Sequence, residues 1–196
     1  MNSNERVYPR RDEDVATPVL VTSIPIVDGV LDHYAAALGD DFILYRNHVH
    51  RVVNLCLAVT GGNRHHLDKI AVAAAFHDLG IWTDHTFDYL APSVSLAREH
   101  LAADSRADWI PEIEAMIANH HKITRARAHP DWLVEPFRRA DWIDVSYGFR
   151  RFGLARPFIE SLFAAWPSAG FHWRLVELTA AWSRRHPLTP LPMVKL

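Results

Sequence analysis

Cysteine is almost absent from this sequence, which limits how the fold can be stabilised. Cys56 is the only cysteine among 196 residues, so no disulfide can form within the chain. Its apolar neighbours Leu55 and Leu57 indicate a small core residue. Residues 1–17 are polar and charged and lack the apolar stretch of a secretory signal. We therefore expect a flexible N-terminal arm over residues 1–17 and a cytoplasmic protein.

The chain also lacks a dominant charge and a long apolar run. Lys and Arg number 21 against 23 Asp and Glu, and this balance gives no overall field that would attract nucleic acid or an anionic membrane. The longest apolar stretch, Ile70–Trp82, is interrupted by His77 and Asp78 and is shorter than the roughly 20 residues that cross a bilayer. We expect a small-molecule partner and neither a nucleic-acid nor a membrane partner. The oligomeric state, including a homo-oligomer, stays open.

What the sequence does have is helical periodicity along most of its length. Hydrophobic residues make up 49% of the chain, enough for one ordinary core, and they recur at spacings of three and four residues. No alternating run bounded by hairpin turns predicts a strand. We expect an all-α, single-domain helical bundle over residues 18–190 and a C-terminal tail over residues 191–196. The expected helices cover about 30–38, 41–60, 67–77, 93–102, 110–121, 133–147, 157–165 and 171–185.

One histidine and one aspartate stand out by their position. His77 and Asp78 directly follow the apolar run Ala73–Phe76, at the end of a helix that is predicted to be buried on nearly all sides. Burying both groups without partners would cost several kcal/mol. A divalent cation removes this cost, because neutral imidazole and ionised carboxylate are ligands that it prefers. Adjacent residues of a regular helix diverge by about 100°, so both reach one ion only near a helix end, and Gly80 provides such an irregularity.

Three segments place histidine and aspartate in similar helical contexts. They are His48-Val49-His50-Arg51-Val52, Ala74-Ala75-Phe76-His77-Asp78-Leu79-Gly80 and Arg139-Ala140-Asp141-Trp142-Ile143-Asp144. In this order they resemble the H…HD…D signature of the HD superfamily of metal-dependent phosphohydrolases. The resemblance covers about residues 45–147 and implies an all-helical domain of the HD type.

The resemblance also implies a set of metal ligands. The first histidine of the signature falls on His48, the HD pair on His77 and Asp78, and the last aspartate on Asp141. Asp78 is also expected among the catalytic residues. Asp144 competes with Asp141 for the last position, and the Ala-Asp context favours Asp141.

Relatives that hold two metals supply extra histidines between the HD pair and the last aspartate. His120 and His121 lie in this interval at the end of a predicted helix, and His100 is a further candidate. Each also has a structural explanation, because a charged histidine suits the negative end of a helix dipole. The His-Pro that many two-metal relatives carry is missing from Tyr89–Ser93. By this resemblance we expect a divalent transition metal (Mn, Fe, Co, Ni or Zn) as one ion, with a second ion as the alternative.

Several charged residues complete the predicted site. Lys122, Arg125 and Arg127 form a local basic cluster that could hold an anionic substrate group, and Arg51 could supply a further cation. A solvated loop is the alternative explanation for the basic cluster. Asp84, just past the HD turn, is a candidate general acid or base.

These residues predict a hydrolase. A metal lowers the pKa of bound water from 15.7 to about 7 and supplies hydroxide at neutral pH, which suits hydrolysis of a nucleotide or small phosphate ester. The resemblance also allows hydration of a small nitrile-like compound, oxidation by two irons, or a non-catalytic ligand-binding module.

Overall fold

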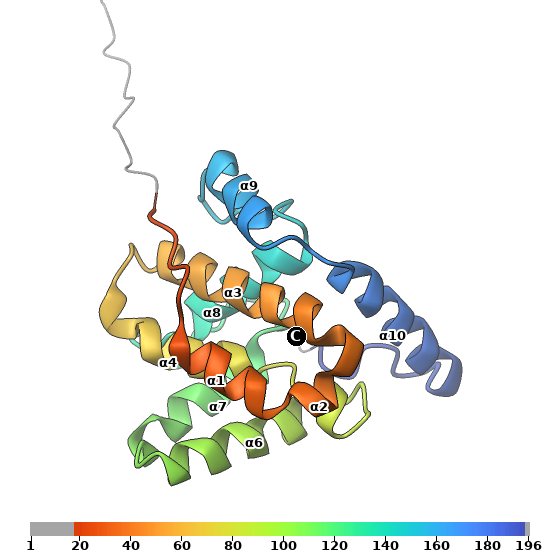
Figure 1. Cartoon of the computed structure of the whole chain (residues 1–196). Coiled ribbons are helices and arrows are strands. Elements are labelled where there is room, and N and C mark those ends of the chain that lie inside the picture. The colour runs from red at the N-terminus through yellow and green to blue at the C-terminus, as the bar shows by residue number, and fades with distance from the viewer. Residues whose placement is uncertain (1–17, 195–196) are drawn as a thin grey trace, which may run out of the picture.

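The computed structural model describes residues 18–194, and every regular element in that span is a helix, which confirms the predicted all-α class (Figure 1). The predicted arm over residues 1–17 lies outside the described residues. The α-helices are α1 Pro25–His33, α2 Ala35–Leu38, α3 Phe42–Val59, α4 Leu67–Phe76, α5 Gly80–Thr83, α6 Leu90–Ala103, α7 Ile110–Asn119, α8 Val134–Val145, α9 Arg156–Ala165 and α10 Phe171–Arg185. Single turns of 3-10 helix over Gly39–Asp41, Arg64–His66 and Ala107–Trp109 precede α3, α4 and α7.

Helices α3 and α4 run through the middle of the bundle. All residues of α4 over Ile70–Phe76 are buried, as expected for an Ala-rich helix that is apolar on all sides. Helix α3 is buried over Asn47–Leu57, although this stretch contains His48, Arg51 and Asn54. Buried polar groups require partners inside the protein. The partners of the polar groups on α3 therefore define the functional centre.

The other helices surround this pair. Helix α3 packs against α8, α4 and α1, while α6 and α7 pack against each other and against α4. Helices α9 and α10 lie at the periphery, and both contact α3 (Figure 1). The result places the middle of α3, the end of α4, the end of α7 and the middle of α8 around one interior region.

Most predicted helices start and end within a few residues of the observed ones, and α10 has the predicted bounds. The first predicted helix is wrong in its extent. It begins earlier, because Pro25 stands at its first position, where a missing N–H costs nothing. It is also interrupted at Tyr34, whose φ of −100° and ψ of 13° are not helical, so α1 and α2 replace one helix. The short helix α5 was not predicted.

Gly80 lets the turn that follows α4 pack closely against α6. A Cβ at this position would lie 2.7 Å from the carbonyl oxygen of Tyr89 and 3.0 Å from the backbone nitrogen of Ser93. The Gly80 N–H donates a hydrogen bond to Ser93 Oγ at 3.0 Å. Only glycine fits here, and the contact holds the turn that carries His77 and Asp78.

The single cysteine and the C-terminal residues were also the subject of predictions. Cys56 is fully buried, as predicted, and burial raises the pKa of its thiol. Met193 is buried, so the described part of the predicted tail packs against the domain. Among residues 18–194, no helix has both the length and the apolar character needed to span a membrane.

Candidate metal centre

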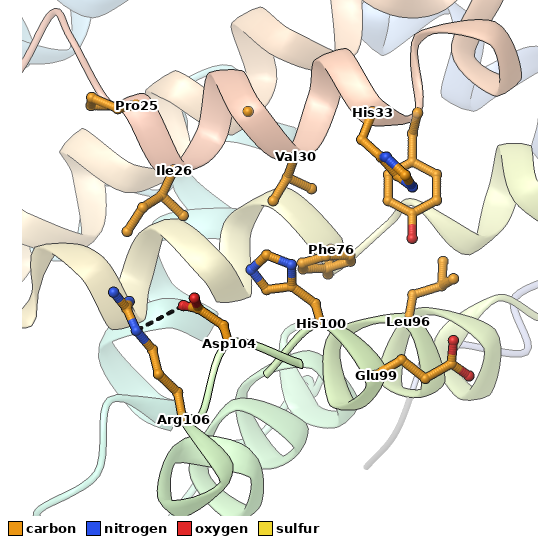
Figure 2. A pocket seen from close by; sticks show the side chains of 12 residues that line it. Pro25, Ile26, Val30, His33, Phe76, Leu96, Glu99, His100, Asp104 and Arg106 are labelled. Carbon is orange, nitrogen blue, oxygen red and sulfur yellow. Dashed lines mark ion pairs between the residues drawn. The ribbon is translucent and has the colours of Figure 1, made fainter. Parts of the chain in front are cut away.

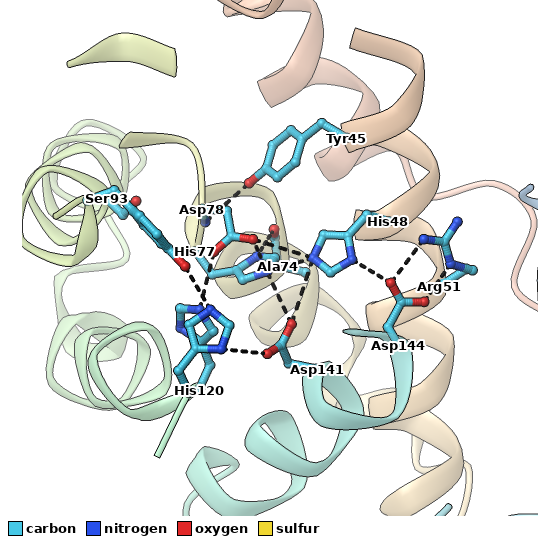
Figure 3. A network of polar contacts seen from close by, with 12 residues as sticks. Tyr45, His48, Arg51, Ala74, His77, Asp78, Ser93, His120, Asp141 and Asp144 are labelled. Carbon is cyan, nitrogen blue, oxygen red and sulfur yellow. Dashed lines mark hydrogen bonds and ion pairs between the residues drawn. The ribbon is translucent and has the colours of Figure 1, made fainter. Parts of the chain in front are cut away.

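Six histidine and aspartate side chains from distant parts of the sequence meet inside the bundle. Figure 3 shows His48, His77, Asp78, His120 and Asp141 of this set turned toward one another. They come from the middle of α3, from the turn after α4, from the residues after α7 and from α8. They are His48, His77, Asp78, His120, His121 and Asp141. The structure therefore brings together all six residues that were predicted from the sequence as metal ligands.

Four of these side chains direct one ligand atom each toward the others. The Nε2 atoms of His48 and His77 are 2.9 Å apart. Asp78 Oδ2 lies 3.6 Å from the first and 3.3 Å from the second, and Asp141 Oδ1 lies 3.8 Å from both. Two nitrogen or oxygen ligands of a shared zinc-sized ion lie about 2.9 Å apart at a right angle and about 3.3 Å apart at the tetrahedral angle. The two histidine nitrogens and the Asp78 oxygen have separations close to these values and form one group with metal-ligand spacing, and the Asp141 oxygen lies farther away at 3.8 Å.

The remaining carboxylate oxygens face a different pair of histidines. Asp78 Oδ1 lies 3.2 Å from His120 Nε2, and Asp141 Oδ2 lies 3.4 Å from His121 Nδ1. Asp78, His120 and His121 form a second group with metal-ligand spacing. Both carboxylates thus stand between two groups of imidazoles, an arrangement that suits one ion or two neighbouring ions.

Several ligand atoms in this centre are buried without a hydrogen-bond partner in the described part of the chain. They are Asp78 Oδ1, His120 Nε2 and both carboxylate oxygens of Asp141. An unsatisfied buried polar group costs about 1–3 kcal/mol, and a charged one costs more. A divalent cation would satisfy all four atoms, because each is a metal ligand. The donor set fits a metal, and this buried group of histidine and aspartate could hold an ion.

Hydrogen bonds on the outer side of two rings orient the ligand nitrogens. His77 Nδ1 lies 2.7 Å from the carbonyl oxygen of Ala74, and His120 Nδ1 lies 2.6 Å from that of Ile117. A carbonyl only accepts, so each Nδ1 carries the proton and donates it. Each Nε2 consequently presents a lone pair to the cluster, which is the tautomer that binds a metal.

Burial shifts the protonation equilibria of the cluster. Burial lowers the pKa of His77 to about 3 and raises the pKa of the Asp141 carboxyl to about 7. Burial also tends to raise the pKa of Asp78, but His77 and His120 outweigh it and hold that pKa well below its usual range. Burial acts to lower the pKa of His120, but the nearby carboxylates of Asp78 and Asp141 outweigh burial, and the pKa of His120 is raised. The carboxylates and imidazoles of the cluster thus shift one another's pKa values, as expected for ionisable groups that are buried in contact.

A buried ion pair lies directly behind His48. The His48 Nδ1–H donates to Asp144 Oδ2 at 2.6 Å, while Arg51 donates from Nε to Oδ1 at 2.5 Å and from Nη2 to Oδ2 at 2.9 Å. All three residues are fully buried. Burial would raise the pKa of Asp144, but Arg51 and His48 hold it well below its usual range. The structure corrects the expectation that Arg51 binds substrate, because Asp144 occupies its guanidinium. It also places Asp144 on the far side of His48 rather than in the cluster.

The start of α10 completes the surroundings of His48. Phe171 stacks on the imidazole, with ring centroids 4.0 Å apart and an interplanar angle of 15°. His172 donates from Nε2 to the main-chain carbonyl of Asp144 at 2.8 Å. These two residues lie beyond the region covered by the motif resemblance, so no motif predicts them. The only signal was the apolar start of a helix, which is common to core residues.

Two tyrosines that were not predicted from the sequence also contact the cluster. The Tyr89 hydroxyl lies 2.7 Å from His121 Nε2. The Tyr45 hydroxyl donates to Ala75 O at 3.0 Å and accepts from the Asp78 N–H at 3.4 Å. Burial raises the pKa of both phenols well above the usual value, so they are neutral hydrogen-bonding groups in the wall of the centre.

Two other predicted site residues lie outside the cluster. Asp84 is exposed, and its carboxylate accepts a hydrogen bond from Thr83 Oγ1 at 2.8 Å, so the structure does not bring it to the ligands. Lys122 lines a cavity of about 600 Å³ together with Arg125 and Arg127, and no acidic side chain is among the lining residues. Lys122 directly follows His121 in the sequence, and none of the six clustered histidine and aspartate residues lines this cavity.

His100, the further histidine candidate, lies in a separate cavity of about 580 Å³ between α1, α4 and α6 (Figure 2). Its ring centroid is 5.1 Å from that of Phe76. At one end of this cavity Asp104 and Arg106 pair at 3.0 Å. His100 belongs to neither group with metal-ligand spacing in residues 18–194. The structure therefore leaves His100 out of the metal centre.

Comparison with known proteins adds no relative: no family model, no curated protein and no solved structure matches the chain. The chemistry of this centre is therefore inferred from its own atoms.

Proposed function

We propose that this protein is a metal-dependent hydrolase of the HD type that cleaves a nucleotide or a small phosphate ester. The observation that carries the proposal is the set of unpaired, buried ligand atoms on Asp78, His120 and Asp141. Each would lower stability if it had no partner. A metal gives all of them a partner at once. The same residues stand in an order similar to the HD signature, which supports hydrolytic chemistry.

Residues of the chain supply the binding and orienting groups. His48, His77, Asp78 and Asp141 would hold the ion. Asp144 fixes the Nδ1–H tautomer of His48, so that Nε2 is the free ligand atom. A divalent ion bound there would polarise a phosphoryl oxygen and lower the pKa of a bound water to about 7.

The cationic cavity supports an anionic substrate. Lys122, Arg125 and Arg127 line it without a carboxylate. Guanidinium groups bind phosphate oxygens through paired hydrogen bonds, and they stabilise charge that develops in phosphate transfer. A phosphate ester is therefore favoured over a neutral nitrile-like compound, because a neutral compound forms no ion pair with the three cations.

A second candidate is oxidation of the substrate at two irons. The second group, Asp78 with His120 and His121, favours it because it offers ligands for another ion. Metal analysis separates the candidates: two irons per chain with a visible absorption band support oxidation, whereas redox-silent ions support hydrolysis. A non-catalytic binding module would bind ligand without turnover.

The test combines metal content with turnover. The protein is stripped with a chelator and reloaded with Mn, Fe, Co, Ni or Zn. Bound metal is then measured by elemental analysis, and phosphate release is measured on a panel of nucleotides and small esters. The Asp78→Asn variant removes a carboxylate shared by both groups, and Asp108→Asn changes an exposed aspartate outside the cluster as a matched control.

We expect the metal-loaded protein and Asp108→Asn to release phosphate and to bind equal amounts of metal. We expect Asp78→Asn to lose both properties. Unchanged metal content in Asp78→Asn would overturn the ligand assignment. Full metal loading without turnover on the whole panel would overturn the phosphohydrolase assignment and leave the metal site intact.

A further inference from the structure

A third cavity, of about 280 Å³, lies between helix α10 and α5 with the segment that follows α5. Its apolar wall includes the aromatic rings of Trp82, Phe87 and Trp182 beside the aliphatic side chains of Ile81, Leu178 and Ala181. Its polar lining includes Arg174 and Arg185. This cavity is independent of the metal ligands, none of which lines it.

The charged side chains that line the cavity, Arg174 and Arg185, are both positive. No carboxylate lines the cavity. Arg174 is held by Asp41 at 2.8 Å and by Glu177 at 3.2 Å, so its charge is compensated by groups outside the cavity. Arg185 is exposed and forms no ion pair with any residue between 18 and 194. The cavity therefore combines flat aromatic walls with one uncompensated positive charge.

Two histidines add hydrogen-bonding capacity to the same lining. His85 and His186 both face the cavity. The imidazole of His186 stacks on Trp182, with ring centroids 4.0 Å apart and an interplanar angle of 25°. The Trp182 indole is itself fixed, because its Nε1–H donates to the carbonyl oxygen of Thr189 at 2.9 Å. The aromatic wall is consequently held in place before any ligand enters.

The cavity shares a wall with the metal centre but does not open onto its ligands. Trp82 contacts Tyr45 with ring centroids 4.6 Å apart, and Tyr45 lies against His48 at 6.3 Å. Phe87 lies 6.1 Å from Tyr89, whose hydroxyl contacts the second group of histidines. One layer of aromatic rings separates the two sites, so each can be filled without the other.

We propose that this cavity binds a small aromatic anion, with its ring against the aromatic side chains and its negative group on Arg185. The volume of about 280 Å³ lies just below the range of about 300–1,000 Å³ that is usual for small-molecule sites, which limits the ligand to about one ring. Aromatic rings favour offset or edge contacts with other rings, and a charge-assisted hydrogen bond from a guanidinium fixes an anionic group. Carboxylate and phosphate share this chemistry.

The test uses benzoate and phenyl phosphate as probes, measured by calorimetry with the full chain, both metal-loaded and after chelation. Benzamide is the neutral counterpart of benzoate, and acetate is an anion without a ring. Arg185→Gln removes the charge in the cavity. Arg184→Gln is the matched control, because Arg184 is the preceding exposed arginine and does not line the cavity. Trp182→Leu removes one aromatic wall.

We expect benzoate to bind with the same affinity in metal-loaded and chelated protein, and benzamide and acetate to bind at least about tenfold more weakly. Arg185→Gln should weaken benzoate about tenfold and leave benzamide unchanged, while Arg184→Gln should change neither. Trp182→Leu should weaken both ring compounds. A preference for phenyl phosphate over benzoate would identify the anionic group as a phosphate.

Three results would overturn the proposal. Equal affinity for benzoate and benzamide would remove the role of charge. Equal effects of Arg184→Gln and Arg185→Gln would show general attraction to a basic helix end. Loss of benzoate binding on chelation would place the ring at the metal centre. Circular dichroism of each variant is the control for folding. Arg185 is exposed, so we expect its replacement to leave the core unchanged.

Discussion

Replacing Asp144 by asparagine tests how the fold positions the first metal ligand. The Asp144 carboxylate accepts hydrogen bonds from His48 and Arg51, and all three residues are fully buried. Asparagine has nearly the same shape but no charge. The substitution therefore leaves the Arg51 guanidinium in the interior without its counter-ion.

The expected loss of stability can be estimated from these contacts. Removing one partner of a buried ion pair destabilises a protein by about 3–5 kcal/mol. In the variant, Arg51 keeps its hydrogen bonds to the carbonyl oxygens of Trp166 at 2.8 Å and Pro167 at 3.2 Å. The asparagine also retains one acceptor oxygen. We therefore expect the lower end of the range, a fall of about 3 kcal/mol in the free energy of unfolding.

The same substitution should weaken metal binding. A carboxylate that accepts the Nδ1–H of a ligating histidine fixes its tautomer, and loss of such a partner reduces metal affinity about 10- to 100-fold. Metal affinity is measured by titration against a competing chelator, and stability by urea unfolding of the metal-free protein. The double replacement Arg51→Met with Asp144→Leu should restore part of the stability, because hydrophobic residues often replace a buried pair without loss, while the buried His48 Nδ1–H stays without its acceptor. It should not restore the affinity.

The exposed ion pair between Arg156 and Glu160 provides the control for this prediction. Glu160→Gln breaks that pair and should change stability by less than about 1 kcal/mol. A loss below about 1 kcal/mol in Asp144→Asn would refute the view that Arg51 depends on this carboxylate. Unchanged metal affinity in a variant that has lost stability would refute the positioning of His48.

Three further predictions follow from the same structure. Gly80→Ala should destabilise the protein by about 1–3 kcal/mol in urea unfolding, because the new methyl group would collide with backbone atoms at the start of α6. Phe171→Ala should cost about 3–5 kcal/mol and also weaken metal binding, because it removes the ring that stacks on His48. Burial acts to raise the pKa of Glu135, but the hydrogen bonds from Arg138 and Arg139 outweigh burial and lower this pKa to about 2. Its stabilising contribution, about 1 kcal/mol at most after solvent screening, is present above about pH 4.5 and lost as the pH falls toward 2. Thermal unfolding between pH 2 and 5 should therefore show a smaller acid loss in Glu135→Gln.

The fold could be predicted where local signals agree. Helix α10 has the predicted bounds because an amphipathic stretch lies between Gly170 and Pro187. Helix α4 was recognisable as buried because it has no polar face. The break at Tyr34 could not be predicted, because no glycine or proline stands there. The short helix α5 could not be predicted either, because its packing against α6 determines it.

The candidate site could be predicted only in part, because local sequence signals mark some of its residues and only the packing of distant segments brings in the others. His77 and Asp78 stand out because ionisable groups end an apolar helix. The pairing of Arg51 with Asp144 joins residues 93 positions apart, and no local pattern distinguishes it from a surface pair. Phe171 reaches the site because the link between α9 and α10 returns the chain to α3, which depends on the whole fold.

One local device does connect the sequence to the geometry of the centre. His77 and His120 occupy the C-cap positions of α4 and α7, and each donates its Nδ1–H to the carbonyl oxygen three residues earlier. The last carbonyl groups of a helix have no partner within the helix, so this hydrogen bond satisfies one of them and turns the ring at the same time. The Nε2 atom then points beyond the helix end. Two helices that end at the same interior region therefore present two oriented ligand atoms without help from a metal, whereas His48, in the middle of α3, has no free carbonyl nearby and needs Asp144 and Arg51 instead.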